Sequence, residues 1–224
     1  MAVGEERQSG ATVAELTEAI SAATPVLDAD DRRIVSSTYR LLAKGEPVTA
    51  GAIAAASELQ VGRVEEALNS WPGVYRDDDG GVVGFWGLAL SKIDHEYRLV
   101  VEGKTTFAWC ALDTLFIPAY LGKTLRVETT DPVTGTPVSL VVDENGVRDL
   151  TPSAAVVSVV IPNGPFGFDV IESFCEKVFF FASEETGRSW TAKHEGTTLL
   201  SVPEAFELGE AVFGARNLGN ARRQ

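Results

Sequence analysis

The chain has 224 residues and a mass of 23.9 kDa, which suffices for one sizeable core or for a core with a small satellite domain. Its formal net charge of −13 repels phosphate backbones and anionic headgroups, so we expect neither nucleic acid nor a membrane as a partner. The first residues lack the apolar stretch of a signal peptide, and no uncharged apolar run reaches the length of a membrane span. We therefore expect a cytoplasmic protein whose two cysteines are free thiols.

Helical patterns fill the first third of the chain. Apolar spacing, acidic starts and capping residues predict four helices, over 11–23, 28–42, 49–56 and 61–71. Asp79, Gly80 and Gly81 then provide the turn of a β-hairpin. Helices followed by a hairpin are typical of a winged helix, so residues 1–87 are predicted to form a helical, winged-helix-like N-terminal domain.

The pattern changes at Leu88. Strand-like runs lie at 90–103, 125–130, 138–150 and 154–162, and capping residues mark two helices that follow Ser183 and Ser201. The nearly continuous apolar stretch 105–121 is predicted to be a helix. The fold class is therefore α+β, in which the N-terminal domain packs on a mixed-sheet α/β core that covers residues 88–224.

A winged helix raises the hypothesis of a DNA-binding regulator. The candidate recognition helix has Glu65 and Glu66 against a single arginine, Arg63. From residue 28 to residue 87 the chain has ten acidic residues against six lysines and arginines. These charges favour a packing role for the domain over DNA recognition.

The stretch "TFAWCALDTLFIPAYLG" contains Cys110, with Asp113 three positions later. A lone buried cysteine often only fills space, but a carboxyl on the same face of an apolar helix needs a reason to be there. Helix capping does not provide one if the helix is already under way at Thr105. His95 and His194 have no partner at metal-ligand spacing and are expected on the surface.

Common cofactor chemistries have no support in the sequence. The chain lacks a dinucleotide fingerprint, a P-loop and a Gly-x-Ser-x-Gly elbow. A thiol oxidoreductase is also disfavoured, because Cys110 and Cys175 lie 65 positions apart and form no Cys-x-x-Cys motif.

Several segments together resemble the organomercurial (alkylmercury) lyases. The segments are "LLAKGEPVT", "FAWCALDTLFIPAYLG", "TGTPVSLVV", "SFCEKVFFFAS", "SWTAKHEG" and "SVPEAFELG". They cover the chain from about Leu41 to Gly209, and the two cysteine motifs occur in the family's order. The resemblance implies a winged-helix-like N-terminal part on an alkylmercury lyase core, and it implies that Cys110, Asp113 and Cys175 carry out protonolysis of a carbon–mercury bond.

The resemblance also implies the ligands and partners. Cys110, Cys175 and Asp113 would hold mercury as substrate or product, with no organic cofactor. Thiolate is the soft ligand that suits mercury, and an aspartate whose pKa is raised by apolar neighbours suits a general acid. The implied partners are a small organomercurial, and cytosolic thiols or a mercuric reductase that collects Hg(II).

The family pattern is incomplete here, and one alternative stays open. Further cysteines of some family members are replaced by Glu176 and by Thr129 and Thr130, which bears on metal release more than on the reaction. A mercury-sensing or thiol-sensing winged-helix regulator with a degenerate lyase-like domain is the alternative to an enzyme.

Overall fold

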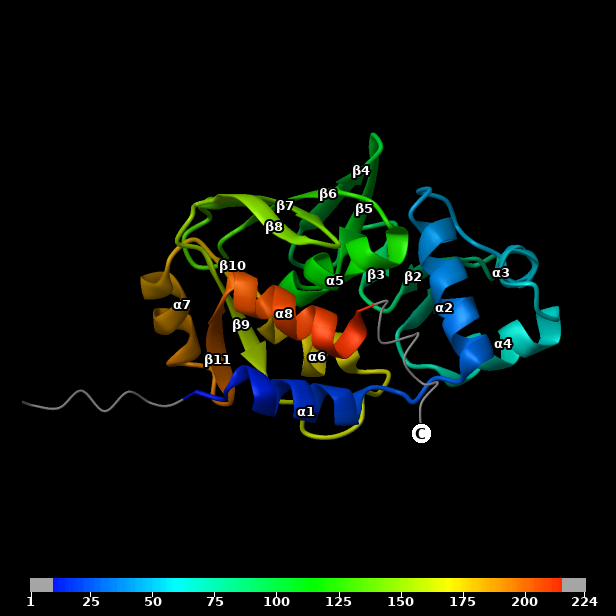
Figure 1. The fold of residues 1–224 in the computed structure, drawn as a ribbon, viewed down its shortest axis with the longest axis horizontal. Helices are drawn as coiled ribbons and strands as arrows, with labels where there is room; N and C mark the ends of the chain where they lie inside the picture. Colours follow the sequence, from blue (N-terminus) through cyan, green and yellow to red (C-terminus); the bar gives the residue numbers. More distant parts are fainter. Residues whose placement is uncertain (1–9, 215–224) are drawn as a thin grey trace, which may run out of the picture.

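The computed structural model describes residues 10–214 (Figure 1). The helices are α1 (Val13–Ala23), α2 (Ala29–Leu42), α3 (Ala50–Ser57), α4 (Val61–Ser70), α5 (Ala111–Leu121), α6 (Val170–Ser173), α7 (Glu184–Thr191) and α8 (Val202–Phe213), with a 3-10 turn over Cys175–Lys177. The strands are β1 (Val74–Arg76), β2 (Val82–Phe85), β3 (Leu88–Ala89), β4 (Tyr97–Val101), β5 (Lys104–Ala108), β6 (Leu125–Thr130), β7 (Pro137–Asp143), β8 (Gly146–Thr151), β9 (Val156–Val160), β10 (Phe180–Phe181) and β11 (Thr197–Ser201). No helix in this range is both long and apolar enough to cross a membrane.

Two sheets organise the described residues. The first has eight strands in the order β1-β2-β3-β5-β4-β6-β7-β8, and the second has three in the order β10-β9-β11. The expected α+β class is confirmed. Every strand pairing in residues 10–214 is antiparallel, whereas the sequence analysis expected a mixed sheet with parallel pairs as well.

The smaller lobe contains α2, α3, α4 and the β1–β2 hairpin, at the right of Figure 1. Asp28 caps α2 by accepting from the Asp31 amide, and Thr49 caps α3 by accepting from the Ala52 amide. These capping residues fix where each helix begins, as expected from the sequence. The arrangement is that of a winged helix, with the hairpin as its wing.

The first helix does not belong to this lobe in space. In Figure 1, α1 runs along the larger lobe, and it packs against α8 from the far end of the chain. The first sheet also crosses residue 87, because β2 pairs with β3. The division into domains 1–87 and 88–224 therefore stays a prediction, and its outermost residues, 1–9 and 215–224, lie outside the described residues.

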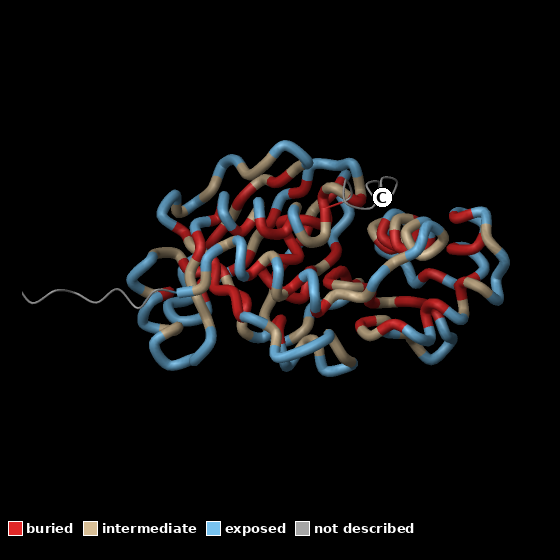
Figure 2. The backbone as a smooth tube through the Cα atoms, turned by 60° about the horizontal axis from the view of Figure 1, so that its bottom comes forward, coloured by how far each residue is buried: buried red, intermediate tan, exposed pale blue. Residues whose placement is uncertain are grey.

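The apolar core extends through both lobes. Figure 2 shows buried backbone inside the larger lobe and again inside the smaller one. Helix α5 lies centrally, since it packs against α8 on one side and against α2 on another. All but two of its 11 residues are buried, which makes α5 the element that joins the two lobes.

Candidate active site

Cys110 lies at the start of α5 and not within it. The predicted helix over 105–121 is wrong in its first part, because residues 105–108 belong to strand β5 and the helix begins at Ala111. Cys110 is the N-cap residue of this helix and has an extended backbone. The Trp109 amide donates to the Gly87 carbonyl at 3.0 Å, so the turn before the helix is fixed on the backbone that joins the lobes.

Asp113 has a capping role that the sequence analysis rejected. It occupies the third position of α5, and its Oδ2 accepts a hydrogen bond of 2.9 Å from the Cys110 amide. The sequence analysis rejected this role because it placed the start of the helix too early. The capping bond holds the carboxylate beside the cysteine that precedes the helix.

Cys175 comes from a distant segment that is tied to the start of α5. It opens the 3-10 turn after α6. Three residues later, the Val178 carbonyl accepts from the Ala111 amide at 3.0 Å and from the Tyr97 hydroxyl at 3.1 Å. These two bonds explain why residues 65 positions apart in sequence meet.

The structure brings the three sequence-predicted residues together. One Sγ atom from each of Cys110 and Cys175 and a carboxylate oxygen of Asp113 all lie within 4.8 Å of one another. All three residues are buried, but unequally: Cys110 is 0% exposed, Cys175 5% and Asp113 9%. Two soft sulfur ligands and one acid thus share a single position in the interior.

A cavity of about 220 Å³ leads to this position. Cys175 and Asp113 line it, whereas Cys110 is fully buried and is not among the lining residues. Both lobes contribute walls. From the N-terminal part come Thr24, Pro25, Leu27, Arg32, Tyr39, Pro72, Gly73, Trp86 and Gly87, and from the remainder come Trp109, Phe116, Tyr120, Phe166, Val170, Phe174, Val212, Phe213 and Gly214. The apolar walls suit a hydrocarbon group.

Gly87 lies directly against the Asp113 carboxyl. Its φ of +94° lies in the region that favours glycine, and a Cβ at this position would clash with the carboxyl carbon and one oxygen of Asp113. The Tyr39 hydroxyl donates to the Trp86 carbonyl at 2.6 Å and so holds the preceding residue in place. The sequence analysis missed Gly87, although a glycine directly after Trp86 and before a strand was the available signal.

Burial dominates the electrostatics of Asp113. It raises the pKa of the carboxyl to about 6, while hydrogen bonds from the thiol and the backbone amide of Cys110 act against this rise. The group is therefore mostly ionised at neutral pH, and about half of it is protonated one pH unit lower. A carboxyl in this range can both accept and donate a proton.

Both thiols are held in their neutral form. Burial raises the pKa of Cys110 well above its usual value, and the hydrogen bond with Cys175 and the Asp113 charge act in the same direction. The hydrogen bond with Cys110 lowers the pKa of Cys175, but burial and the charges of Asp113 and Glu176 outweigh it. Burial therefore opposes the thiolate form of both cysteines, although Cys110 lies at a helix start.

The two histidines lie apart from the cavity lining. His194 is exposed and stacks on Trp190, with ring centroids 3.7 Å apart, as expected of a surface residue. His95 is half-buried, which the sequence analysis did not expect. Its Nε2 lies 3.1 Å from the Thr129 hydroxyl and 3.0 Å from the Thr130 carbonyl, and burial lowers its pKa.

The fold and the site together define a winged-helix α+β protein with a buried pair of thiols beside a carboxyl. Comparison with protein families matches residues 90–214 to the alkylmercury lyase model and residues 14–86 to the helix-turn-helix domain of alkylmercury lyase. The chain belongs to the alkylmercury lyase family, as the sequence resemblance indicated, and the expected organomercurial lyase assignment is confirmed at that level.

Curated relatives agree with this assignment, and a solved structure shares the fold. The chain is 38% identical to an alkylmercury lyase of Streptomyces lividans over 81% of this chain and 82% of the relative. It is 40% identical to that of Staphylococcus epidermidis, over 79% of each chain. The crystal structure of the mercury-bound form of MerB2 matches with a TM-score of 0.69 and 20% identity, covering 92% of this chain and 98% of that one, and it shows the shared fold.

Proposed function

We propose that this protein cleaves the carbon–mercury bond of alkylmercury and arylmercury compounds by protonolysis, which gives a hydrocarbon and Hg(II). The observation that supports this most is the meeting of Cys110, Cys175 and Asp113 within 4.8 Å. Mercury is a soft cation for which thiolates compete better than carboxylates or water. In this proposal the two cysteines bind the metal, and the aspartic acid protonates the carbon.

Cys175 captures the substrate first in this proposal, because it lines the cavity whereas Cys110 is fully buried and does not. The thiol proton leaves as sulfur binds mercury. Cys110 then adds as a second sulfur ligand and passes its proton to the ionised Asp113, which lies against it. The second thiolate raises the electron density on mercury and on the carbon bound to it.

Asp113 then protonates that carbon. The carbon–mercury bond breaks, both of its electrons go to carbon, and a carbon–hydrogen bond forms. One thiol proton ends in the hydrocarbon and the other leaves with the thiolate or water ligand that Cys175 displaces from mercury, while mercury stays in its +2 state on two thiolates. The buried, apolar setting that raises the pKa of Asp113 favours this delivery.

No organic cofactor enters this reaction scheme, because the chain's own groups provide the sulfur ligands and the proton. Turnover requires that Hg(II) leave the two sulfurs, and thiols or a mercuric reductase in the cytoplasm are the proposed acceptors. Thiol exchange is the chemistry that removes mercury from a dithiolate without a further catalyst.

The test is hydrocarbon release from methylmercury and phenylmercury in the presence of excess thiol. Cys110→Ser and Cys175→Ser are expected to abolish methane and benzene release. Asp113→Asn is expected to retain mercury binding and to lose hydrocarbon release. Near-UV circular dichroism establishes that each variant is folded, and full activity in either serine variant contradicts the proposal.

The winged helix makes a mercury-sensing or thiol-sensing DNA-binding regulator the second candidate function. Its charges weigh against DNA binding, because Arg63 of α4 pairs with Asp28 and Asp31, and Arg76 of the wing pairs with Glu65 at 2.9 Å. These arginines are engaged within the protein. A salt-dependent gel shift with DNA fragments separates the candidates, since a regulator shows a shift and an enzyme alone does not.

A further inference from the structure

Arg32 is a cation in the wall of the cavity that leads to the two sulfurs. It lies in the first turn of α2, is half-buried, and lines the same cavity as Cys175 and Asp113. Its side chain has no hydrogen bond and no ion pair with any residue between 10 and 214. A guanidinium carries five donors, so its hydrogen-bonding capacity is left available to the cavity.

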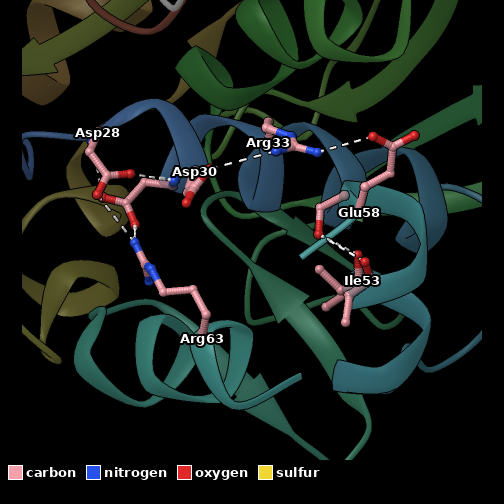
Figure 3. Close-up of polar contacts among 9 residues, drawn as sticks. Asp28, Asp30, Arg33, Ile53, Glu58 and Arg63 are labelled. Carbon is pink, nitrogen blue, oxygen red and sulfur yellow. Dashed lines mark hydrogen bonds and ion pairs between the residues drawn. The ribbon is translucent and has the colours of Figure 1, made fainter. Parts of the chain in front are cut away.

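The neighbouring acids are occupied by other arginines. Asp28 and Asp31 pair with Arg63, and Asp30 pairs with Arg33, as Figure 3 shows for Asp28 and Asp30. Arg33 reaches Glu58 as well, at 3.3 Å. That no described residue pairs with the Arg32 side chain therefore does not follow from a lack of carboxylates nearby.

Local stability does not explain an arginine at this position. A cation in the first turn opposes the helix dipole, which favours negative charge there. Partial burial of an unpaired guanidinium also costs solvation free energy. An anion in the cavity would offset both effects, because guanidinium binds carboxylate through two parallel hydrogen bonds.

We propose that Arg32 selects mercury compounds that contain a carboxylate group in addition to the metal. This inference rests on the proposed function. The carboxylate has two sources: the organic group of the mercurial, or a thiol that carries the mercury into the site as its thiolate complex. In a protein with a net charge of −13, Arg32, which is the one lysine or arginine among the described residues that line the cavity, gives an anionic substrate a local point of attachment.

The experiment compares kcat/KM for charged and neutral substrates in Arg32→Gln and Arg32→Lys. In the first arm, 4-mercuribenzoate is set against phenylmercury, both with 2-mercaptoethanol as the thiol. In the second arm, phenylmercury is supplied with cysteine or with 2-mercaptoethanol. Arg40→Gln is the matched control, because Arg40 lies in the same helix, is exposed and does not line the cavity.

Arg32→Gln is expected to lower the charged-to-neutral ratio by about tenfold or more in one arm, and that arm identifies the source of the carboxylate. Arg32→Lys is expected to restore part of the ratio, and Arg40→Gln to leave it unchanged. The inference is overturned if the ratio is unchanged in both arms, or if Arg32→Gln slows every substrate equally. Failure of the unaltered protein to cleave any of these compounds would instead contradict the proposed function.

Discussion

The Cys110 amide donates to the Asp113 carboxylate at 2.9 Å, so one hydrogen bond both caps helix α5 and fixes the acid beside the thiol. The bond satisfies an amide that the helix leaves unpaired. It also orients the group that, in the proposed reaction, protonates carbon. Local folding and the geometry of the site therefore depend on the same pair of residues.

Gly87→Ala is expected to reduce hydrocarbon release strongly, because the new methyl group clashes with the Asp113 carboxyl. Gly45→Ala is the matched control. Gly45 has a φ of +85°, and a Cβ there meets no atom within 4 Å. Both variants are expected to lose about 1 kcal/mol of stability from a left-handed alanine. Equal activity of the two variants would show that Gly87 does not position Asp113.

The pH profile of kcat/KM is expected to fall on the acid side of about pH 6. Below the pKa of Asp113 the carboxyl is already protonated and cannot accept the Cys110 proton. The value of kcat/KM therefore falls as pH falls through about 6, and it reaches its full level above that pH. In Asp113→Asn the residual activity is expected to show no such limb, and a limb that persists unchanged assigns the titration to another group.

Asp113→Asn is expected to stabilise the fold at pH 8. The folded-state pKa lies above the unfolded value, so the native state binds more protons between about pH 4 and 6, and stability falls as pH rises through this window. Removal of the buried charge is expected to regain roughly 1 to 3 kcal/mol. Thermal unfolding at pH 8 and pH 4 measures this gain, which should vanish at the lower pH.

Asp131→Asn is expected to have the opposite effect on stability. The buried Asp131 carboxylate accepts hydrogen bonds from the amides of Val133, Thr134 and Ala182 and from the Thr186 hydroxyl. Burial raises the pKa of Asp131, but these bonds outweigh it and the net shift is downward. Its contribution is therefore present above the unfolded pKa and is lost as pH falls through the folded one.

The expected loss in Asp131→Asn is about 2 kcal/mol or more at pH 7, measured by denaturant unfolding. The loss should shrink as pH falls through the folded-state pKa of Asp131, which its hydrogen bonds hold below the usual value for aspartate. Because Asp131 is not among the residues that line the cavity, the folded fraction is expected to keep its hydrocarbon-releasing activity. An unchanged unfolding midpoint would contradict the anchoring role.

Much of the fold was predictable because capping residues mark helix starts directly. Thr49, Ser183 and Ser201 each precede the helix that the sequence indicated. The start of α5 was not predictable, because Cys110 is an unusual cap and the apolar run begins before the helix, with Phe107, Ala108 and Trp109. Periodicity cannot separate a buried strand from a buried helix.

The residues of the candidate site were identified through the family resemblance, while their surroundings required coordinates. Local patterns contain no information on the bonds from Ala111 and Tyr97 to the Val178 carbonyl, which bring the Cys175 segment to α5. Arg32 is also invisible to sequence reasoning. Its availability depends on which acids Arg33 and Arg63 occupy in three dimensions.

A single-turnover experiment with phenylmercury, in which no thiol other than the protein's own cysteines is present, tests the central claim most directly. Two quantities are measured in the same sample: the benzene released, and the cysteine thiols that still react with a thiol reagent after denaturation. The account predicts one benzene per chain and protection of both Cys110 and Cys175 by the retained Hg(II). Stoichiometric benzene release with either cysteine still free would contradict it.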